Sequence, residues 1–220
     1  MKKEIKILFT SVGRRVELMQ EFKFASERLG INLEIYGADI TKTAPALSFC
    51  DHIVIVPRIN DNSYIPSLLK CCKDNQIDAL IPTIDTDLLV LAKNKEKFKA
   101  VGTEVLVSEE EKIAICRDKR LTSSYFESVG LSAPYPVDDY KKYSAGFPAF
   151  IKPKDGSSSI FAYKVNDERE LGTFASQVPD YIIQPFIDGT EYTVDVFCDF
   201  AGCRCSGGGG LPYADHRRRT

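Results

Sequence analysis

A lysine at the end of an apolar segment, followed by glycine and serine, has residue types and spacing that could bind phosphate. The segment FPAFIKPKDGSSSIF (residues 147–161) ends a strand-like run at Lys152, and the loop after it contains Gly156, Ser157, Ser158 and Ser159. Buried strands seldom carry an unpartnered lysine. Glycine permits a tight turn, serines offer hydroxyl donors and lysine supplies charge, so the pattern favours an anion clamp. It is no Walker loop, because G-x-x-x-x-G-K-[ST] is absent from the chain.

Charged residues also follow the strand-like segments near the N-terminus. Gly13, Arg14 and Arg15 come after IKILFT, and Asp39 ends LEIYGAD. Arginines at a helix N-terminus can hold a carboxylate or a phosphate, and solvent-exposed arginines are an equally good interpretation. Gly13 and Asp39 also suit a dinucleotide site, but the G-x-G-x-x-G fingerprint is missing, which disfavours nicotinamide binding.

A pair of carboxylates, Asp85 and Asp87, follows the segment ALIP. Such a pair at a strand end can bind an amine or ammonium group, whereas aspartate is also a common helix N-cap. We expect one of the two to be the cap and leave a substrate role open for the other.

The elements that must position these residues alternate between strand and helix over residues 1–107. This alternation predicts an α/β fold, with a Rossmann-like parallel sheet covered by helices on both faces. Ligands bind at the carboxyl ends of the strands in such sheets, where the charged residues named above lie. In the first helix, Leu18, Phe22, Ala25 and Leu29 form one stripe and Gly30 marks the end.

The pattern changes near residue 108. Ser108 and Glu111 form a capping-box pattern that predicts one helix running to Gly130, as part of a connection over residues 108–136. Residues 147–197 are mainly strand-like, with a short helix at 167–177. The last 23 residues contain four consecutive glycines and no periodicity, which predicts disorder. We therefore predict domains at 1–107 and 108–197 and a tail at 198–220.

Composition excludes several classes of protein. A net charge of −2 disfavours a general nucleic-acid surface. No apolar segment reaches the roughly 18–20 residues that a membrane helix needs. Seven cysteines without a secretory signal predict reduced thiols in the cytoplasm. The spacing of Cys198, Cys203, Cys205 and His216 matches no structural zinc pattern, so we predict no metal site there.

Three motifs follow one another along the chain: DKRLTSSYF (118–126), FPAFIKPKDGSSS (147–159) and YIIQPFIDGTEYTVDVF (181–197). Together they resemble the first half of an ATP-grasp domain. The segments 35–57 and 77–89 resemble the pre-ATP-grasp domain of proteins similar to the carbamoyl phosphate synthase large subunit. The resemblance covers about residues 4–199 and implies a helical connection and a partial α+β lid subdomain after the Rossmann-like sheet.

The resemblance also implies an activity and a set of roles. ATP would activate a small carboxylate as an acyl phosphate, which an amine then attacks. Lys119 and Lys152 would contact the phosphates, and the serine-rich loop of Gly156, Ser157, Ser158 and Ser159 would cover them. Gln184 and the apolar hinge of Phe186 and Ile187 would hold the adenine. Glu191 would bind the ribose.

The sequence departs from the family pattern at three places. An acid often stands where this chain has Gln184, and a further glycine usually follows the serines, where this chain has Ile160. Near Ala201 the pattern stops before the Glu and Asn ligands of Mg²⁺, so we expect a truncated chain with little activity. The alternative is a nucleotide- or anion-binding module without catalysis. Exposed strand edges would favour pairing with a second copy.

Overall fold

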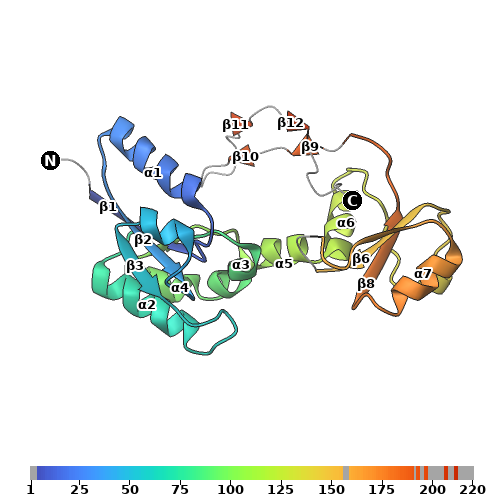
Figure 1. Ribbon diagram of the computed structural model, residues 1–220, viewed down its shortest axis with the longest axis horizontal. Coiled ribbons are helices and arrows are strands. Elements are labelled where there is room, and N and C mark those ends of the chain that lie inside the picture. The colour runs from blue at the N-terminus through green and yellow to red at the C-terminus, as the bar shows by residue number, and fades with distance from the viewer. Residues whose placement is uncertain are drawn as a thin grey trace. The chain divides into compact units, whose positions relative to one another are not determined.

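The computed structural model describes residues 4–155 and 159–190, together with the short strands at 192–193, 196–197, 206–207 and 211–212 (Figure 1). The chain divides into two compact units, Met1–Val129 and Gly130–Thr220. Unit 1 contains helices α5 and α6, which the predicted boundary at 107/108 assigns to the second domain. The three predicted domain ranges stay predictions.

Unit 1 is built on a five-stranded parallel sheet, which confirms the predicted α/β class. Its strands are β1 (Glu4–Thr10), β2 (Asn32–Asp39), β3 (His52–Ile55), β4 (Ala79–Pro82) and β5 (Glu104–Val105). Their order is β3-β2-β1-β4-β5, with Leu8 of the central β1 beside Tyr36 of β2 and Leu80 of β4. Because the order reverses at β1, the carboxyl ends of β1 and its neighbours form the usual ligand edge of such a sheet.

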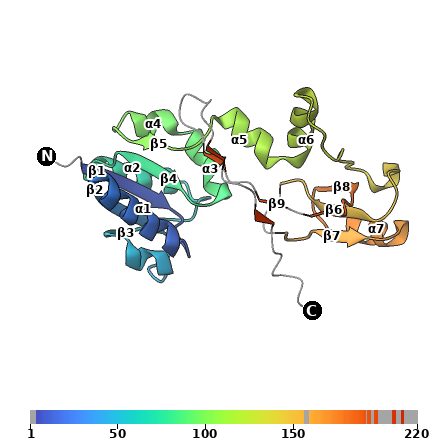
Figure 2. The same cartoon turned by 90° about the horizontal axis from the view of Figure 1, so that it is seen from above.

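Helices cover both faces of this sheet (Figures 1 and 2). They are α1 (Val16–Leu29), the 3₁₀ helix η1 (Pro45–Phe49), α2 (Tyr64–Asn75), α3 (Asp85–Ala92) and α4 (Lys95–Lys99). Phe9 packs with α1 and η1 in one core cluster, whereas Leu8 packs with α2, α3 and α4 in another. Neighbouring strand residues thus point to opposite faces, as a doubly covered sheet requires.

The first helix ends where the sequence predicts, but its buried stripe differs. Gly30 takes the left-handed conformation (φ 65°) and caps α1. Leu29, expected on the apolar stripe, is 70% exposed, and Met19 is the fully buried residue of α1. The C-terminal turn of α1 therefore extends beyond the surface that the sheet can cover.

The connection after the sheet contains two helices instead of the one predicted. Helix α5 covers Glu110–Arg117 and α6 covers Lys119–Ser128. The break occurs at Asp118, whose carboxylate accepts a hydrogen bond from the backbone nitrogen of Arg120 at 2.9 Å and caps α6. The predicted Ser108 cap is wrong, because Glu109 is the N-cap residue of α5 and makes no side-chain cap bond.

Unit 2 has a three-stranded antiparallel sheet of order β7-β6-β8. The strands are β6 (Ala149–Pro153), β7 (Tyr163–Val165) and β8 (Tyr181–Pro185), accompanied by α7 (Glu168–Ala175) and the 3₁₀ helix η2 (Tyr140–Lys142). Ile151 and Ile183 pack with Leu171 of α7 in a third core cluster. Helix α7 confirms the short helix expected within 167–177 and begins after the N-cap Asp167.

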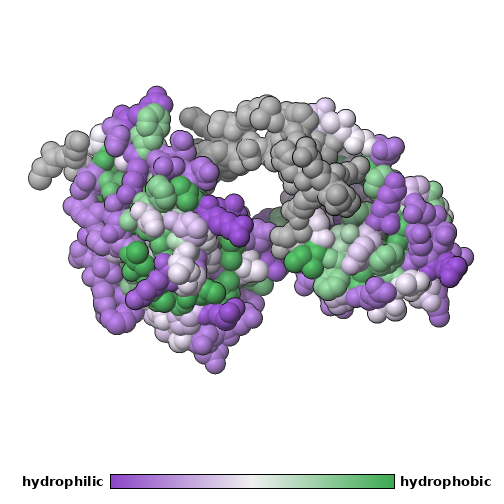
Figure 3. Space-filling view, in the orientation of Figure 1, coloured by the Kyte–Doolittle hydropathy of each residue, from purple (hydrophilic) through white to green (hydrophobic). Residues whose placement is uncertain are grey.

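Short strand pairs occur further along the chain. β9 (Tyr192–Thr193) pairs with β12 (Leu211–Pro212), and β10 (Val196–Phe197) pairs with β11 (Ser206–Gly207), both antiparallel. Most of the predicted disordered tail, 198–220, lies outside the described residues. Within the described residues, no helix is both long and apolar enough to cross a membrane. Figure 3 shows a mainly hydrophilic face of unit 1 with apolar residues exposed among the polar ones.

Candidate functional site

One face of the β7-β6-β8 sheet in unit 2 gathers the residues expected to bind a nucleotide. Along β6 the side chains of Ala149 and Ile151 are buried in the core, so Phe150 and Lys152 lie on the opposite face. Gln184 of β8 pairs with Phe150 and shares this face. The Lys152 ammonium lies 5.5 Å from the centre of the Phe150 ring, a cation–π distance. The alternation of β6 therefore places the predicted phosphate-binding lysine outside the core.

The chain leaves β8 through Phe186 and Ile187, the predicted adenine hinge. The Phe186 amide donates to the Pro148 carbonyl at 3.1 Å, so this amide is already used. In the part of the chain that the structure describes, the Phe186 carbonyl and the Ile187 amide make no hydrogen bond. An acceptor next to a donor on neighbouring peptide groups suits the donor–acceptor edge of a purine.

Gln184 is 8% exposed, and its amide nitrogen donates to the Pro134 carbonyl at 2.6 Å. This bond ties β8 to the segment before η2 and uses one of the two N–H groups of the side-chain amide. The side-chain oxygen and the second N–H therefore remain as the acceptor and donor that Gln184 can offer a ligand.

Sequence reasoning missed one cation on the same face, Lys164. It pairs directly with Phe150 across β6 and β7, and its ammonium lies 4.0 Å from the centre of the Phe186 ring. Strand alternation in YKV (residues 163–165) could have identified Lys164, because Tyr163 and Val165 pack in the core and Lys164 therefore lies on the other face. Lys164 and Lys152 thus place two positive charges on the face that carries Gln184.

The other predicted nucleotide-binding residues are distributed differently. Gly156, Ser157, Ser158 and Glu191 lie outside the described residues. Ser159 is exposed, with φ 56°, a conformation uncommon for residues other than glycine. Lys119 belongs to unit 1 and begins α6 directly after Asp118, whose pKa the hydrogen-bonded Arg120 guanidinium lowers.

A second candidate site lies in unit 1, at the carboxyl ends of β1 to β4. Asp39 ends β2, and its carboxylate accepts from the Gly13 amide at 2.9 Å. A cavity of about 280 Å³ opens beside Asp39 and Ser11. The structure thus brings the predicted residues Gly13 and Asp39 together, at the place where parallel sheets bind ligands.

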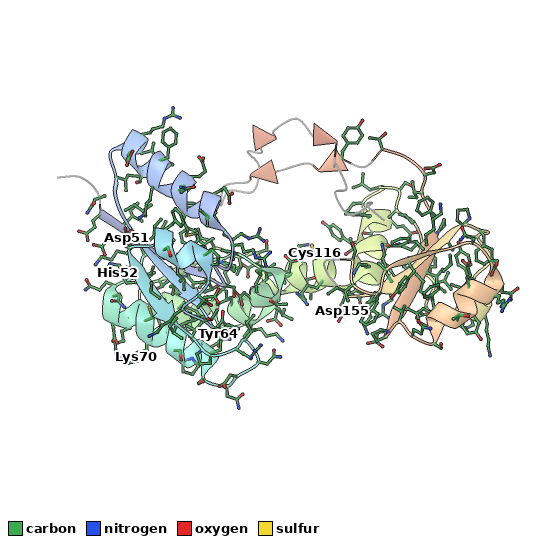
Figure 4. The ribbon with its side chains drawn as sticks, viewed as in Figure 1. Asp51, His52, Tyr64, Lys70, Cys116 and Asp155 are labelled. Carbon is green, nitrogen blue, oxygen red and sulfur yellow. The ribbon has the colours of Figure 1, made fainter. Side chains whose placement is uncertain are left out.

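Asp87 contacts two residues that line this cavity, Ser11 and Tyr64, and is fully buried. It accepts hydrogen bonds from the hydroxyls of Thr10 at 2.7 Å, Ser11 at 2.8 Å and Tyr64 at 3.0 Å. Tyr64, labelled in Figure 4, begins α2, and its pKa is raised by burial and by the Asp87 charge. Asp87 therefore ties β1, α2 and α3 together through three hydroxyl groups.

The expected aspartate cap is wrong. Ile84 is the N-cap residue of α3, and neither Asp85 nor Asp87 makes a side-chain cap bond. Asp85 is exposed, and its backbone carbonyl accepts from Arg117. Arg14 and Arg15 are also exposed, and among the described residues the Arg15 side chain makes only a long 3.5 Å contact, to the Thr83 carbonyl. The anion-binding role of the two arginines stays a prediction.

Neither a thiol nor a metal cluster is assigned to these sites among the residues that the structure describes. Among the described residues, no group of three His, Cys, Asp or Glu side chains is arranged to hold a metal ion. The described cysteines are free, and burial raises the pKa of Cys50 to about 11 and of Cys72 to about 12. The cysteine and histidine set at 198–216 lies outside the described residues.

Two protein-family models match this chain, one over each of two successive segments. A family model described as the PylC-like N-terminal domain matches residues 7–106, and the ATP-grasp domain model matches residues 116–205. The second match covers Lys119, Lys152 and Gln184, in the order that the motifs predict.

Among curated proteins, the chain is 28% identical over 134 residues to a 3-methyl-D-ornithine–L-lysine ligase of Methanosarcina acetivorans, covering 60% of this chain and 33% of the relative. It is 34% identical over 101 residues to a D-alanine–D-alanine ligase of Fusobacterium nucleatum, covering 44% of this chain and 32% of the relative. The chain thus spans about a third of the length of these relatives.

Two solved structures share the fold. An L-amino acid ligase from Bacillus licheniformis superposes with a TM-score of 0.69 at 18% identity, covering 89% of this chain and 48% of that one. The ADP complex of purK, an N5-carboxyaminoimidazole ribonucleotide synthetase, gives 0.70 at 16%, covering 96% and 54%. The finer likeness to carbamoyl phosphate synthase stays a prediction. With both domain models matched in order and the fold shared, this chain belongs to the ATP-grasp superfamily.

Proposed function

We propose that this protein is an ATP-dependent ligase that joins a carboxylate to an amine. The carboxylate attacks the γ-phosphorus of ATP and releases ADP, and the amine then attacks the acyl carbon and releases inorganic phosphate. The family assignment supports this reaction class, and two of the relatives are named as ligases of amino acids. The resemblance supplies the acyl phosphate as the intermediate.

The single observation that carries the proposal is the composition of one face of the β7-β6-β8 sheet. Lys152 stands near one end of β6, and Ala149 at the other end pairs with Pro185, next to the hinge. Lys152 is three residue steps along the strand from Ala149, which is about 10 Å at 3.3 Å per residue. A nucleotide's base and its phosphates lie a comparable distance apart, so one ATP can contact both ends.

Each end of the face has the chemistry that its part of ATP needs. Lys152 offers charge to the phosphates, with Lys119 proposed as a further contact. Lys164 lies over the Phe186 ring and so belongs to the hinge end of the face. The Phe186 ring and the exposed Ile187 side chain offer apolar surface to the adenine. Charged hydrogen bonds to phosphate are worth about 1.5–3 kcal/mol each, so the lysines should dominate the affinity.

The proposal also concerns four residues that the structure does not describe, the metal ion, the cell compartment and the oligomeric state. Ser157, Ser158 and Gly156 would cover the phosphates, and Glu191 would bind the ribose. Mg²⁺ would neutralise the phosphate charge, and none of the described residues is assigned to it. The free thiols favour the cytoplasm. The edge strand β3, with exposed Ile53 and Ile55, favours pairing with a second copy.

Trapping the activated carboxylate tests the reaction class. The chain is incubated with MgATP, individual amino acids and hydroxylamine, and the acyl hydroxamate and ADP are measured. We expect both products at a low rate, in line with the little activity expected from the sequence, and Lys152→Ala should lower that rate by at least about tenfold through the lost phosphate contact. The control is Lys142→Ala, because the Lys142 side chain is 79% exposed and pairs only at 3.5 Å with Asp139.

The outcomes test the site assignment, distinguish a ligase from a binding module and identify the substrate. Equal rates for Lys152→Ala and the wild type would refute the site assignment. ATP binding without hydroxamate from any amino acid would favour a nucleotide-binding module without catalysis. Hydroxamate that depends on one amino acid would identify the carboxylate substrate.

A further inference from the structure

The unit 1 cavity is lined by both polar and apolar side chains. It measures about 280 Å³ and lies where β1, β2, β3 and β4 end. Its polar lining residues are Ser11, Asp39, Arg58 and Tyr64, and its apolar ones are Ile40, Val56, Pro57, Ile59 and Ile84. Ligand pockets are typically about 300–1,000 Å³, so this one suits a small metabolite.

Ser11, one of the residues that line the pocket, has an uncommon backbone conformation. Its φ is +56°, and its hydroxyl donates to Asp87 at 2.8 Å. Because the proton is committed to Asp87, the Ser11 oxygen faces a ligand as an acceptor. Residues in this conformation cluster at ligand sites, where the surrounding contacts compensate for the strain. The Asp87 network supplies those contacts here.

Two opposite charges line the same pocket without pairing with each other. Asp39 accepts from the backbone amides of Gly13 at 2.9 Å and Thr41 at 3.3 Å. Arg58 is exposed, and in the described part of the chain its side chain makes no hydrogen bond or ion pair. Neither charge has a counter-ion among the described residues, so both remain available to a ligand.

We propose that this pocket binds a small α-amino acid in its zwitterionic form. Asp39 and the Ser11 oxygen accept from the ammonium group, Arg58 binds the carboxylate, and the isoleucine and valine side chains contact an aliphatic side chain. A ligand with only one charge leaves either the acid or the arginine unmatched, and a neutral ligand leaves both. The proposal rests on the proposed ligase function, because it names an amino acid as substrate and assigns its binding site.

Calorimetric titration of the full chain tests the pocket directly. The protein L-amino acids and their D enantiomers are titrated one at a time, with and without MgADP. We expect binding of at least one, weakened about ten- to a hundredfold by Arg58→Gln and by Asp39→Asn through loss of a charged contact. The matched control Arg28→Gln removes the same charge from α1, outside the pocket, and should leave the affinity unchanged.

A ligand-side test needs no variant. The amine made by removing the carboxylate from the bound amino acid should bind more weakly than the amino acid, and Arg58→Gln should not weaken it further. Absence of binding for every amino acid, or unchanged affinity in both pocket variants, would overturn the proposal. A parallel MgATP titration separates the two claims: ATP binding without amino-acid binding rejects this pocket alone, whereas amino-acid binding without ATP binding rejects the proposed ligase.

Discussion

Replacing Asp87 by alanine removes the acceptor of three hydroxyl groups at once. Thr10 and Tyr64 are fully buried or nearly so, so water cannot replace the lost acceptor there. Three hydrogen bonds to a carboxylate are worth about 5–9 kcal/mol at 1.5–3 kcal/mol each. Burying the carboxylate costs several kcal/mol, which the variant recovers. We therefore expect Asp87→Ala to lower the free energy of unfolding by about 3–5 kcal/mol.

Asp85→Ala is the matched control, two residues earlier on the same helix. Asp85 is exposed, and the Arg117 contact uses its backbone carbonyl, which alanine keeps. The expected loss is under about 1 kcal/mol, from the helix dipole alone. The two variants thus differ only in whether the carboxylate is buried and hydrogen-bonded.

Urea unfolding followed by far-UV circular dichroism measures both variants. With a urea dependence of about 2 kcal/mol per molar, a 4 kcal/mol loss moves the midpoint down by about 2 M. Hydrogen exchange read by mass spectrometry should locate the loss in peptides of β1, α2 and α3. Equal midpoints for the Asp85 and Asp87 variants would refute the role of the network.

Local packing leads to three further predictions, two on substitutions and one on thiol labelling. Gly37→Ala should destabilise unit 1 by about 1–3 kcal/mol in the same urea assay, because its new Cβ would lie 2.5 Å from the Cys50 sulfur. Gly172→Ala, inside α7 with only an ordinary 3.6 Å contact, should stabilise unit 2 by about 0.5–1 kcal/mol; a loss of stability would contradict this. Cys50 and Cys72 should resist iodoacetamide at pH 8, since a pKa of about 11 leaves roughly a thousandth of Cys50 as thiolate and Cys72 even less, and reactivity should rise with pH. Peptide mapping should show the exposed Cys116 labelled before Cys50 and Cys72, and equal labelling of these three would count against the burial.

The sequence was sufficient for elements whose signal is local. The apolar run of β1, the glycine after α1 and the alternation of unit 1 each follow from periodicity or backbone preference, and the structure has all of them. The side of β6 on which Lys152 lies follows from strand alternation as well. The family assignment required motifs in order, because no single one was specific.

Features that depend on distant residues were not predictable. Asp87 resembles a helix cap in sequence, and only the fold brings Thr10, 77 residues away, to its carboxylate. The break between α5 and α6 depends on Asp118 competing as a cap within a helical pattern. Arg58 carried no motif, and it became a candidate only when the strand ends placed it in one cavity with Asp39.

The affinity for MgATP tests the central claim most directly. Calorimetric titration of the wild-type chain, Lys152→Ala and Lys142→Ala compares the proposed phosphate ligand with an exposed lysine of the same unit. The nucleotide site on β6 and β8 predicts binding by the wild type and the Lys142 variant, with at least about tenfold weaker binding by the Lys152 variant. Equal affinity in all three proteins, or no binding by any, would contradict it.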